Sequence, residues 1–292
     1  MTGVALGLDR KELVLNLKIL SRDPLYVVGA ITSLTFVLTA LVVSVFGTGF
    51  LPYDPDKINL SVTFLPPSSA HLFGTDNLGR DILSRVIAAA PVDAEIGFVI
   101  VGASSLLGIA LGSVSGYFGG RVDEVMMRVT DLFLAFPSLV LAVAIAVALG
   151  PGINHVIEAT FVAWWPIYAR LARAGALSLK ESQFVNAAKV AGASPFSIIR
   201  RHILPNNVSP IVVYATLDIG NAILYASVLS YLGLGAQPPQ SEWGSMVYQG
   251  QNWLGSAWWV SIIPGVTIFI VALGFNLLGD ALRDTLDPRY RR

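Results

Sequence analysis

Residues 180–207 read KESQFVNAAKVAGASPFSIIRRHILPNN and form the longest polar interruption in the second half of a very apolar chain. The pattern predicts two short helices with a turn between them. Small or apolar residues recur on one face of the first helix, at i, i+3, i+4 and i+7: Phe184, Ala187, Ala188 and Ala191. Gly192 follows where a helix commonly ends in the left-handed conformation. We expect this small face to dock closely against another protein.

A second, basic helix is predicted to begin directly after the turn. Ser194 is suited to be its N-cap, and Pro195 fits the first helical position, where a missing N–H costs nothing. Apolar and basic residues then alternate around the helix: Phe196, Ile199, Arg200, Arg201 and Ile203. Pro205 is expected to end it. What the two helices bind depends on where the chain places them.

The composition indicates a membrane protein. Of the 292 residues, 54% are hydrophobic and 13% are charged, and the mean hydropathy is +0.67. Because soluble domains carry about 25% charged residues, we expect an all-α polytopic membrane bundle. The net charge of zero gives no indication of nucleic-acid binding, and the lack of cysteine excludes disulfides and Cys-ligated zinc. The three scattered histidines indicate no metal site.

Six apolar segments are long enough to cross a membrane, which takes about 20 residues. They are residues 25–46, 92–117, 129–149, 157–176, 209–234 and 258–278. The predicted organisation is a cytoplasmic segment 1–24, then a first span and external loop in 25–91. A five-span core occupies 92–283 and contains the cytoplasmic loop 180–207, and a cytoplasmic tail occupies 284–292. An even number of spans places both termini on the same side.

Charge predicts which side that is. Of the 19 Lys and Arg residues, only Lys57, Arg80 and Arg85 fall in the segments on the face opposite the termini. By the positive-inside rule, both termini and the loop 180–207 are therefore cytoplasmic, in a multi-pass protein of the cell membrane. The external loops include three aromatic residues that are either interfacial anchors or contacts for an outside partner: Trp243, Tyr248 and Trp253.

Few residues suggest chemistry inside the membrane. Gly108, Gly112 and Gly116 form a ladder that favours close helix packing, either within the chain or along a pathway or subunit seam. Asp218, with Asn221 one turn on, lies well inside a span, where a carboxylate either lines a pathway or has a hydrogen-bonded structural role. Asp131 lies near the cytoplasmic end of a span, where it either snorkels towards the membrane surface or pairs with Arg128. We find no catalytic constellation and no G-x-x-x-x-G-K-[ST] phosphate loop, so the chain is not an ATPase by itself.

The helix pair has other interpretations. Helix–Gly–helix resembles a DNA-binding helix-turn-helix, but its position in a short loop between two spans argues against that function. An inert amphipathic segment lying on the membrane is a second alternative. For the whole chain, a secondary transporter or channel acting alone would predict inverted repeats and several intramembrane charges, and neither is visible.

Residues 186–207 resemble the signature loop of bacterial and archaeal ABC importer permeases. The family pattern begins Glu-Ala-Ala, has Gly four residues later and ends in Leu-Pro. The corresponding residues are Asn186, Ala187, Ala188, Gly192, Leu204 and Pro205, so that Asn186 replaces the usual Glu. Residues 73–85, 116–139, 230–246 and 278–289 further resemble the dipeptide/oligopeptide subfamily, and in particular the shorter of its two paired permeases.

The resemblance implies the permease subunit of a type I importer. It would pair with a homologous permease, two cytoplasmic ABC ATPase subunits and an external solute-binding protein, with ATP and magnesium bound by the ATPases and no cofactor on this chain. Members carry peptides, oligosaccharides or nickel complexes, and the sequence does not choose among them. The residues implied to dock the ATPase are Glu181, Phe184, Asn186, Ala187, Ala188, Gly192, Ser194, Pro195, Leu204 and Pro205.

Overall fold

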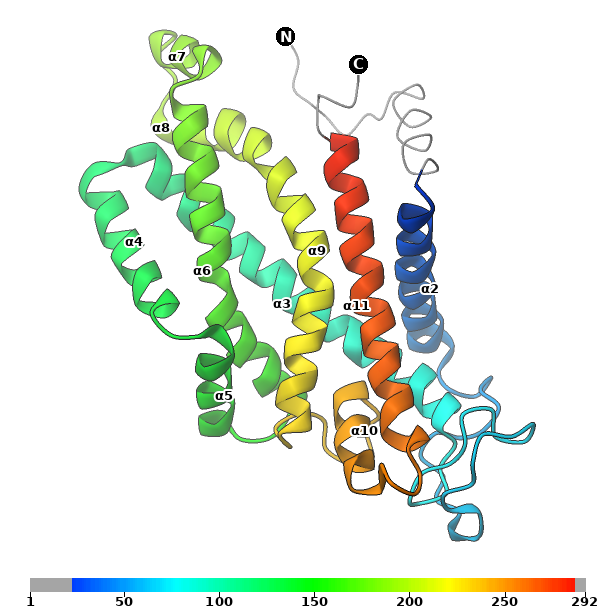
Figure 1. Ribbon diagram of the computed structural model, residues 1–292. Helices are drawn as coiled ribbons and strands as arrows, with labels where there is room; N and C mark the ends of the chain where they lie inside the picture. The colour runs from blue at the N-terminus through cyan, green and yellow to red at the C-terminus, as the bar shows by residue number, and fades with distance from the viewer. Residues whose placement is uncertain (1–22, 287–292) are drawn as a thin grey trace.

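The computed structural model describes residues 23–286, so the predictions for 1–22 and 287–292 lie outside the described residues. As predicted, the described chain is all-α (Figure 1). Its elements are α2 (Pro24–Phe46), η1 (Leu60–Val62), α3 (Ile82–Phe118), α4 (Gly120–Leu134), α5 (Ser138–Leu149), α6 (Ile153–Lys180), α7 (Gln183–Val190), α8 (Pro195–Ile198), η2 (Ile199–Ile203), α9 (Leu204–Tyr231), α10 (Trp243–Gly250), η3 (Gln251–Trp253) and α11 (Trp259–Leu286).

The long helices run alternately up and down the bundle. In Figure 1 the start of α2, the end of α11 and the pair α7–α8 lie at the upper end, whereas α10 and the loop before α3 lie at the lower end. The chain therefore passes along the bundle an even number of times. This arrangement agrees with the predicted position of the helix pair on the side of the termini.

Four helical segments between residues 23 and 286 are long and apolar enough to cross a membrane. They are α2, α3, α11 and the 37-residue stretch Pro195–Tyr231 that includes α9. The predicted third span is not one straight helix, because α4 and α5 are bent by 81° across the break at residues 135–137. Pro137 explains the break, since proline lacks an N–H and disfavours helical conformation in the residue before it.

The predicted fourth span, 157–176, lies inside α6, which is long enough to cross a membrane but less apolar than the four segments above. Charged residues account for this result: Glu158, Arg170, Arg173 and Lys180. The helix nevertheless runs along the bundle between α3, α5 and α9 (Figure 1). Many of its apolar residues pack against neighbouring helices. The helix is therefore part of the bundle although its average hydropathy is low.

Glycines set the close approach of α3 to α6. A Cβ added at Gly108 would lie 2.3 Å from the Cβ of Tyr168, and one added at Gly112 would lie 2.2 Å from the carbonyl oxygen of Ala169. Gly116 is similarly 2.7 Å from the Arg173 oxygen. Of the two interpretations of the glycine ladder, packing within the chain is therefore correct.

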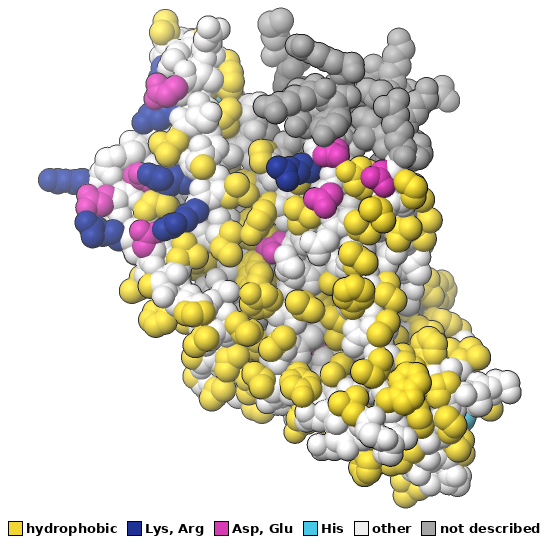
Figure 2. All heavy atoms as spheres, viewed as in Figure 1, with side chains coloured by type: hydrophobic (Ala, Val, Ile, Leu, Met, Phe, Trp, Pro, Cys, Tyr) yellow, Lys and Arg dark blue, Asp and Glu magenta, His cyan; other side chains and the backbone are white. Residues whose placement is uncertain are grey.

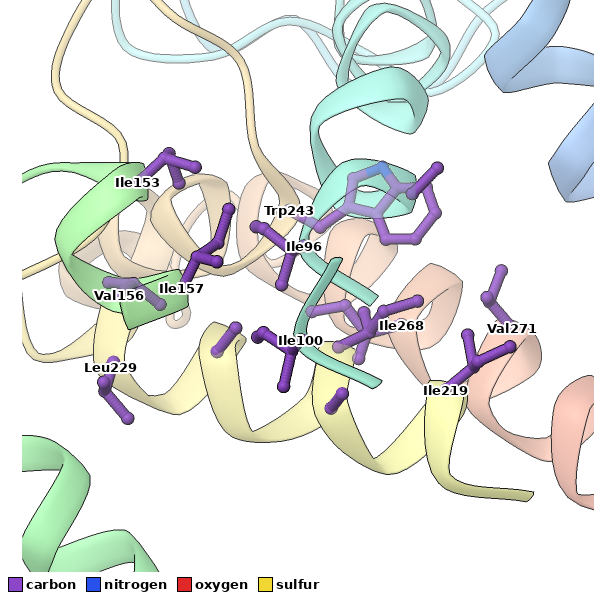
Figure 3. Packing of buried hydrophobic residues seen from close by; sticks show 14 of the residues in the cluster. Ile96, Ile100, Ile153, Val156, Ile157, Ile219, Leu229, Trp243, Ile268 and Val271 are labelled. Atoms are coloured by element: carbon purple, nitrogen blue, oxygen red, sulfur yellow. The ribbon is translucent and has the colours of Figure 1, made fainter. Parts of the chain in front are cut away.

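The main core lies where α3, α6, α9, α10 and α11 meet. Figure 3 shows apolar side chains from these helices converging, among them Ile96, Ile157, Ile219, Trp243 and Ile268. A second, smaller cluster joins the α7–α8 end to the bundle and consists of Tyr117, Ala176, Val185, Ile198, Ile199 and Ile203. The protruding helix pair is thus packed onto the bundle and not suspended from a free loop.

Candidate functional site

Gly192 ends α7 in the conformation that the sequence predicts. Its φ is +79°, in the region where a side chain is disfavoured. Its N–H donates to the Lys189 oxygen, and the N–H of Ala193 donates to the Ala188 oxygen, each at 3.0 Å. These two bonds are the Schellman pattern that satisfies the last carbonyls of a helix. They fix the direction in which the chain leaves α7.

The second helix begins as predicted but does not end as predicted. The Ser194 hydroxyl accepts from the Ser197 N–H at 3.3 Å, and Pro195 occupies the first turn. Pro205, however, lies in the first turn of α9 and does not stop the helix. The π-helical turn η2 comes directly before it, with the Leu204 N–H donating to the Ile199 oxygen. This shift in hydrogen bonding lets the helix continue past proline into α9.

Most of the predicted docking residues are exposed. The exposed ones are Glu181, Phe184, Asn186, Ala187, Gly192, Ser194, Pro195 and Pro205. Ala188 and Leu204 are half-buried and pack against the small cluster at the base of the pair. Two further residues stand out: Val190 is 91% exposed and Phe196 is 72% exposed. Sequence reasoning missed Val190 and assigned Phe196 to an apolar face without identifying it as exposed.

Asn186 has local partners. Its side-chain N–H donates to the Glu181 carbonyl oxygen at 3.4 Å, and its oxygen accepts from the Lys189 ammonium at 3.3 Å. Lys189 also donates to the Lys180 carbonyl at the end of α6. These long, exposed bonds tie α7 to the preceding helix, and each contributes little in water.

Two ion pairs hold α4 against α6 near the helix pair. Asp123 accepts both arms of the Arg173 guanidinium, at 2.5 and 2.6 Å, and a bond from the Ser115 hydroxyl of α3. Asp131 pairs with Arg170 at 2.5 Å, whereas Arg128, the partner considered from the sequence, pairs with Glu124. The sequence did not indicate which basic residue would reach Asp131, because the partner lies on another helix.

Asp218 lies buried between α9 and α6 and is 3% exposed. The indole N–H of Trp164 and the hydroxyl of Tyr168 both donate to its Oδ2, the latter at 2.8 Å. The side-chain N–H of Asn221 reaches Oδ1 at 3.5 Å. These bonds give Asp218 a structural role in joining the two helices, and pathway lining remains a prediction.

The opposite end of the bundle contains a buried polar network. Asp76 accepts from Arg80 at 2.7 Å and from Arg85 at 2.8 Å, and both guanidiniums also reach Gln249 at the end of α10. The network therefore fixes the loop before α3 to α10. Arg80 and Arg85 are two of the three basic residues predicted on this face, and both are buried in the network. Among residues 23–286, Lys57 is the one basic residue of this face that is exposed.

The three predicted interfacial aromatics differ in position. Tyr248 and Trp253 are partly exposed, but Trp243 is 2% exposed and donates to the Val86 oxygen at 2.9 Å. It is a core residue and not an interfacial anchor. The adjacent Glu242 caps α10 by accepting from the Gly244 and Ser245 N–H groups, and burial raises the pKa of its carboxyl above the ordinary value.

The fold defines a polytopic helical membrane protein with a helix pair that is packed onto the bundle and projects from one end. Solved structures with the same fold include an inward-facing MetNI methionine ABC transporter, at TM-score 0.58 and 18% identity over 70% of this chain and 97% of that chain. An amino acid ABC transporter with histidines matches at TM-score 0.52 and 16% identity, covering 68% of this chain and 92% of that one.

Sequence comparison gives the family. Residues 108–292 match the family described as "Binding-protein-dependent transport system inner membrane component", and the chain belongs to it. Relatives include the "Probable D,D-dipeptide transport system permease protein DdpC" of Escherichia coli K12, 44% identical and covering 89% of this chain and 87% of that protein. The "Dipeptide transport system permease protein DppC" of Alkalihalophilus pseudofirmus is 41% identical, covering 94% and 89%.

Proposed function

We propose that the chain is the permease subunit of an ATP-driven importer and forms half of the translocation pathway for a peptide. A homologous permease would supply the other half, and an external binding protein would deliver the solute. Family membership and the fold support the transport role. The names of the relatives, which include dipeptide and glutathione transport permeases, support a peptide solute.

The observation that carries the proposal is the projecting pair α7–α8. It presents exposed small and apolar side chains, among them Ala187, Val190 and Phe196, on a support fixed by the Schellman turn and the small cluster. Figure 2 shows charged side chains gathered at this upper end, over α4 and α7, whereas the middle of the face is mostly hydrophobic. A rigid apolar projection on the charged side suits a soluble partner, which we propose is a pair of ABC ATPase subunits in the cytoplasm.

The support beneath this surface suits force transmission. The π turn makes residues 195–231 one helical stretch, so a displacement of α8 is passed directly into α9. Asn207 in the first turns of α9 adds a bond to the Ala172 oxygen of α6, at 2.7 Å. ATP-driven movement of the ATPases would therefore reach both helices that hold Asp218. A stand-alone secondary transporter or channel would have no use for this projection.

Copurification of the ATPase subunits tests the proposal. Ala187→Glu places a charge on the exposed face of α7 without changing the small cluster, and we expect it to abolish association with the ATPases and ATP-driven peptide uptake. Ala70→Glu, at an exposed position at the other end of the molecule, is the matched control and should retain both. Unchanged ATPase association in Ala187→Glu would contradict the proposed docking surface.

A further inference from the structure

The structural contacts of Asp218 do not depend on a negative charge. Its three hydrogen-bond donors, from Trp164, Tyr168 and Asn221, are all neutral. None of the ion pairs found in residues 23–286 includes it. An amide oxygen at this position could accept the same bonds from Trp164 and Tyr168. Hydrogen bonding between α6 and α9 therefore does not require a carboxylate.

A carboxylate within a membrane bundle is costly unless it meets a cation or a wet cavity. Asp218 lies near the middle of α9, far from either end of the helix and from the charged groups there. Lipid supplies no counter-charge at that depth. A positively charged group that reached this depth during transport would stabilise the ionised form of the carboxyl.

The side chains around Asp218 favour such a group. Tyr214, Asn221 and Tyr225 recur on the same face of α9 at helical spacing and are partly exposed, whereas Asp218 lies deeper between them. The Tyr225 ring contacts Trp164 with centroids 4.5 Å apart, and the Tyr214 ring contacts Tyr168 at 5.4 Å. Aromatic rings attract cations through their faces, and more strongly where water is excluded.

We propose that these residues form a transient site for the ammonium group at the amino end of the transported peptide. We call this set the Asp218 cluster: Trp164, Tyr168, Tyr214, Asp218, Asn221 and Tyr225. The inference rests on the proposed function, because it assumes that a peptide passes along α9. Asp218 supplies the charge, the aromatic rings exclude water, and the partly exposed Asn221 marks the side from which the solute enters. We expect this site to bind the ammonium group weakly, because the carboxylate already accepts hydrogen bonds from neutral donors.

Thiol labelling in the assembled transporter tests the site. The chain contains no cysteine, so Asn221→Cys introduces a single reactive group into it beside Asp218. We expect a methanethiosulfonate carrying trimethylammonium to label this cysteine about tenfold faster than one carrying sulfonate, because one nearby charge attracts the former and repels the latter. Adding Asp218→Asn should abolish the preference, and a dipeptide such as dialanine, presented with the binding protein and ATP, should slow labelling by the cation.

The control is Thr216→Cys, which lies two residues before Asp218 and therefore on the other side of α9 from it, and which should show no preference for the cation. This comparison is made with Asp218 intact, so it decides the matter even if Asp218→Asn fails to assemble. Equal labelling by the two reagents at Asn221→Cys, no labelling by either, or no protection by dialanine would overturn the inference.

ATP-driven dialanine uptake is measured separately, in membrane vesicles that contain the cysteine-free chain. Uptake together with a lack of charge preference in the labelling overturns the Asp218 cluster alone. Absence of uptake overturns the peptide assignment of the proposed function.

Discussion

Glycine residues determine how closely the two central helices approach. The spacing of Gly108, Gly112 and Gly116 in the sequence predicts a close contact, and the structure confirms one. The partner, α6, could not be predicted, because a small residue indicates only that another backbone comes near. The partner is set by how all the helices pack together.

Gly108→Leu should strongly destabilise the protein. The first side-chain atom would already lie 2.3 Å from the Cβ of Tyr168, and overpacking of this kind costs about 1–3 kcal/mol or more. We expect a lower unfolding temperature for the detergent-purified protein. Gly102→Leu on the same helix is the control, since nothing lies within 4 Å of a Cβ at that position. Equal unfolding temperatures for the two variants would contradict the packing described for α3.

Asp76 should be the most sensitive acidic residue in the loop before α3. Asp76→Asn leaves the buried Arg80 and Arg85 without a counter-charge, and breaking a buried pair costs about 3–5 kcal/mol. Glu124→Gln breaks the exposed pair with Arg128, and such pairs contribute at most about 1 kcal/mol. Denaturant unfolding of the two variants in detergent should differ accordingly, and similar midpoints would show that the Asp76 network adds little.

Single residues also show the limit of sequence reasoning. The sequence predicts that Trp243 is an interfacial anchor or a contact for an outside partner, whereas the structure buries it in the core. The sequence does not show that the Val86 oxygen is free to accept from it. Asp131 is a similar case, since Arg128 is near in sequence whereas Arg170 is near in space.

At the scale of elements, capping and turn signals predict local structure well. Gly192, Ser194 and Pro195 each occupy the position that the sequence indicates. The predicted third span is a bent pair of helices, α4 and α5, and the apolar composition of the segment does not indicate the bend at Pro137. The π turn before Pro205 was also missed, since an extra residue in a helical turn leaves no simple pattern in the sequence.

Gly192→Val should weaken transport without preventing membrane insertion. A Cβ there meets no atom within 4 Å, so the cost is conformational and amounts to about 1–2 kcal/mol for a left-handed residue. That cost loosens the turn and should reduce ATP-driven uptake severalfold while leaving protein yield in the membrane unchanged. Gly255→Val has equal space and no positive φ, and it should transport normally. Normal uptake in Gly192→Val would mean that the turn need not be rigid.

At the scale of the whole molecule, hydropathy and charge predict the number of passages and their direction. The described helices alternate as that reading requires, with α7–α8 at the end where α2 begins and α11 ends. Hydropathy supports α6 as a span less strongly than the other long helices, because Glu158, Arg170, Arg173 and Lys180 lower its average. The even passage count and the distribution of Lys and Arg identify it together.

The proposed orientation predicts the outcome of cysteine labelling in intact cells. Leu60→Cys and Val190→Cys place single thiols at strongly exposed positions at opposite ends of the molecule. A membrane-impermeant maleimide should label Leu60→Cys directly and Val190→Cys only after the membrane is opened. The reverse pattern would place the helix pair and the termini outside the cell.

Site-directed crosslinking of α8 to the ATPase tests the central claim most directly. Phe196→Cys, in a chain that otherwise lacks cysteine, carries a thiol-linked photocrosslinker at an exposed position of α8, and Leu72→Cys carries the same probe at an exposed position at the other end of the molecule. We predict that the assembled transporter gives a crosslink between Phe196→Cys and an ATPase subunit and none from Leu72→Cys. Assembled, transport-competent complexes with no ATPase crosslink from Phe196→Cys, or with one from Leu72→Cys, would contradict the account.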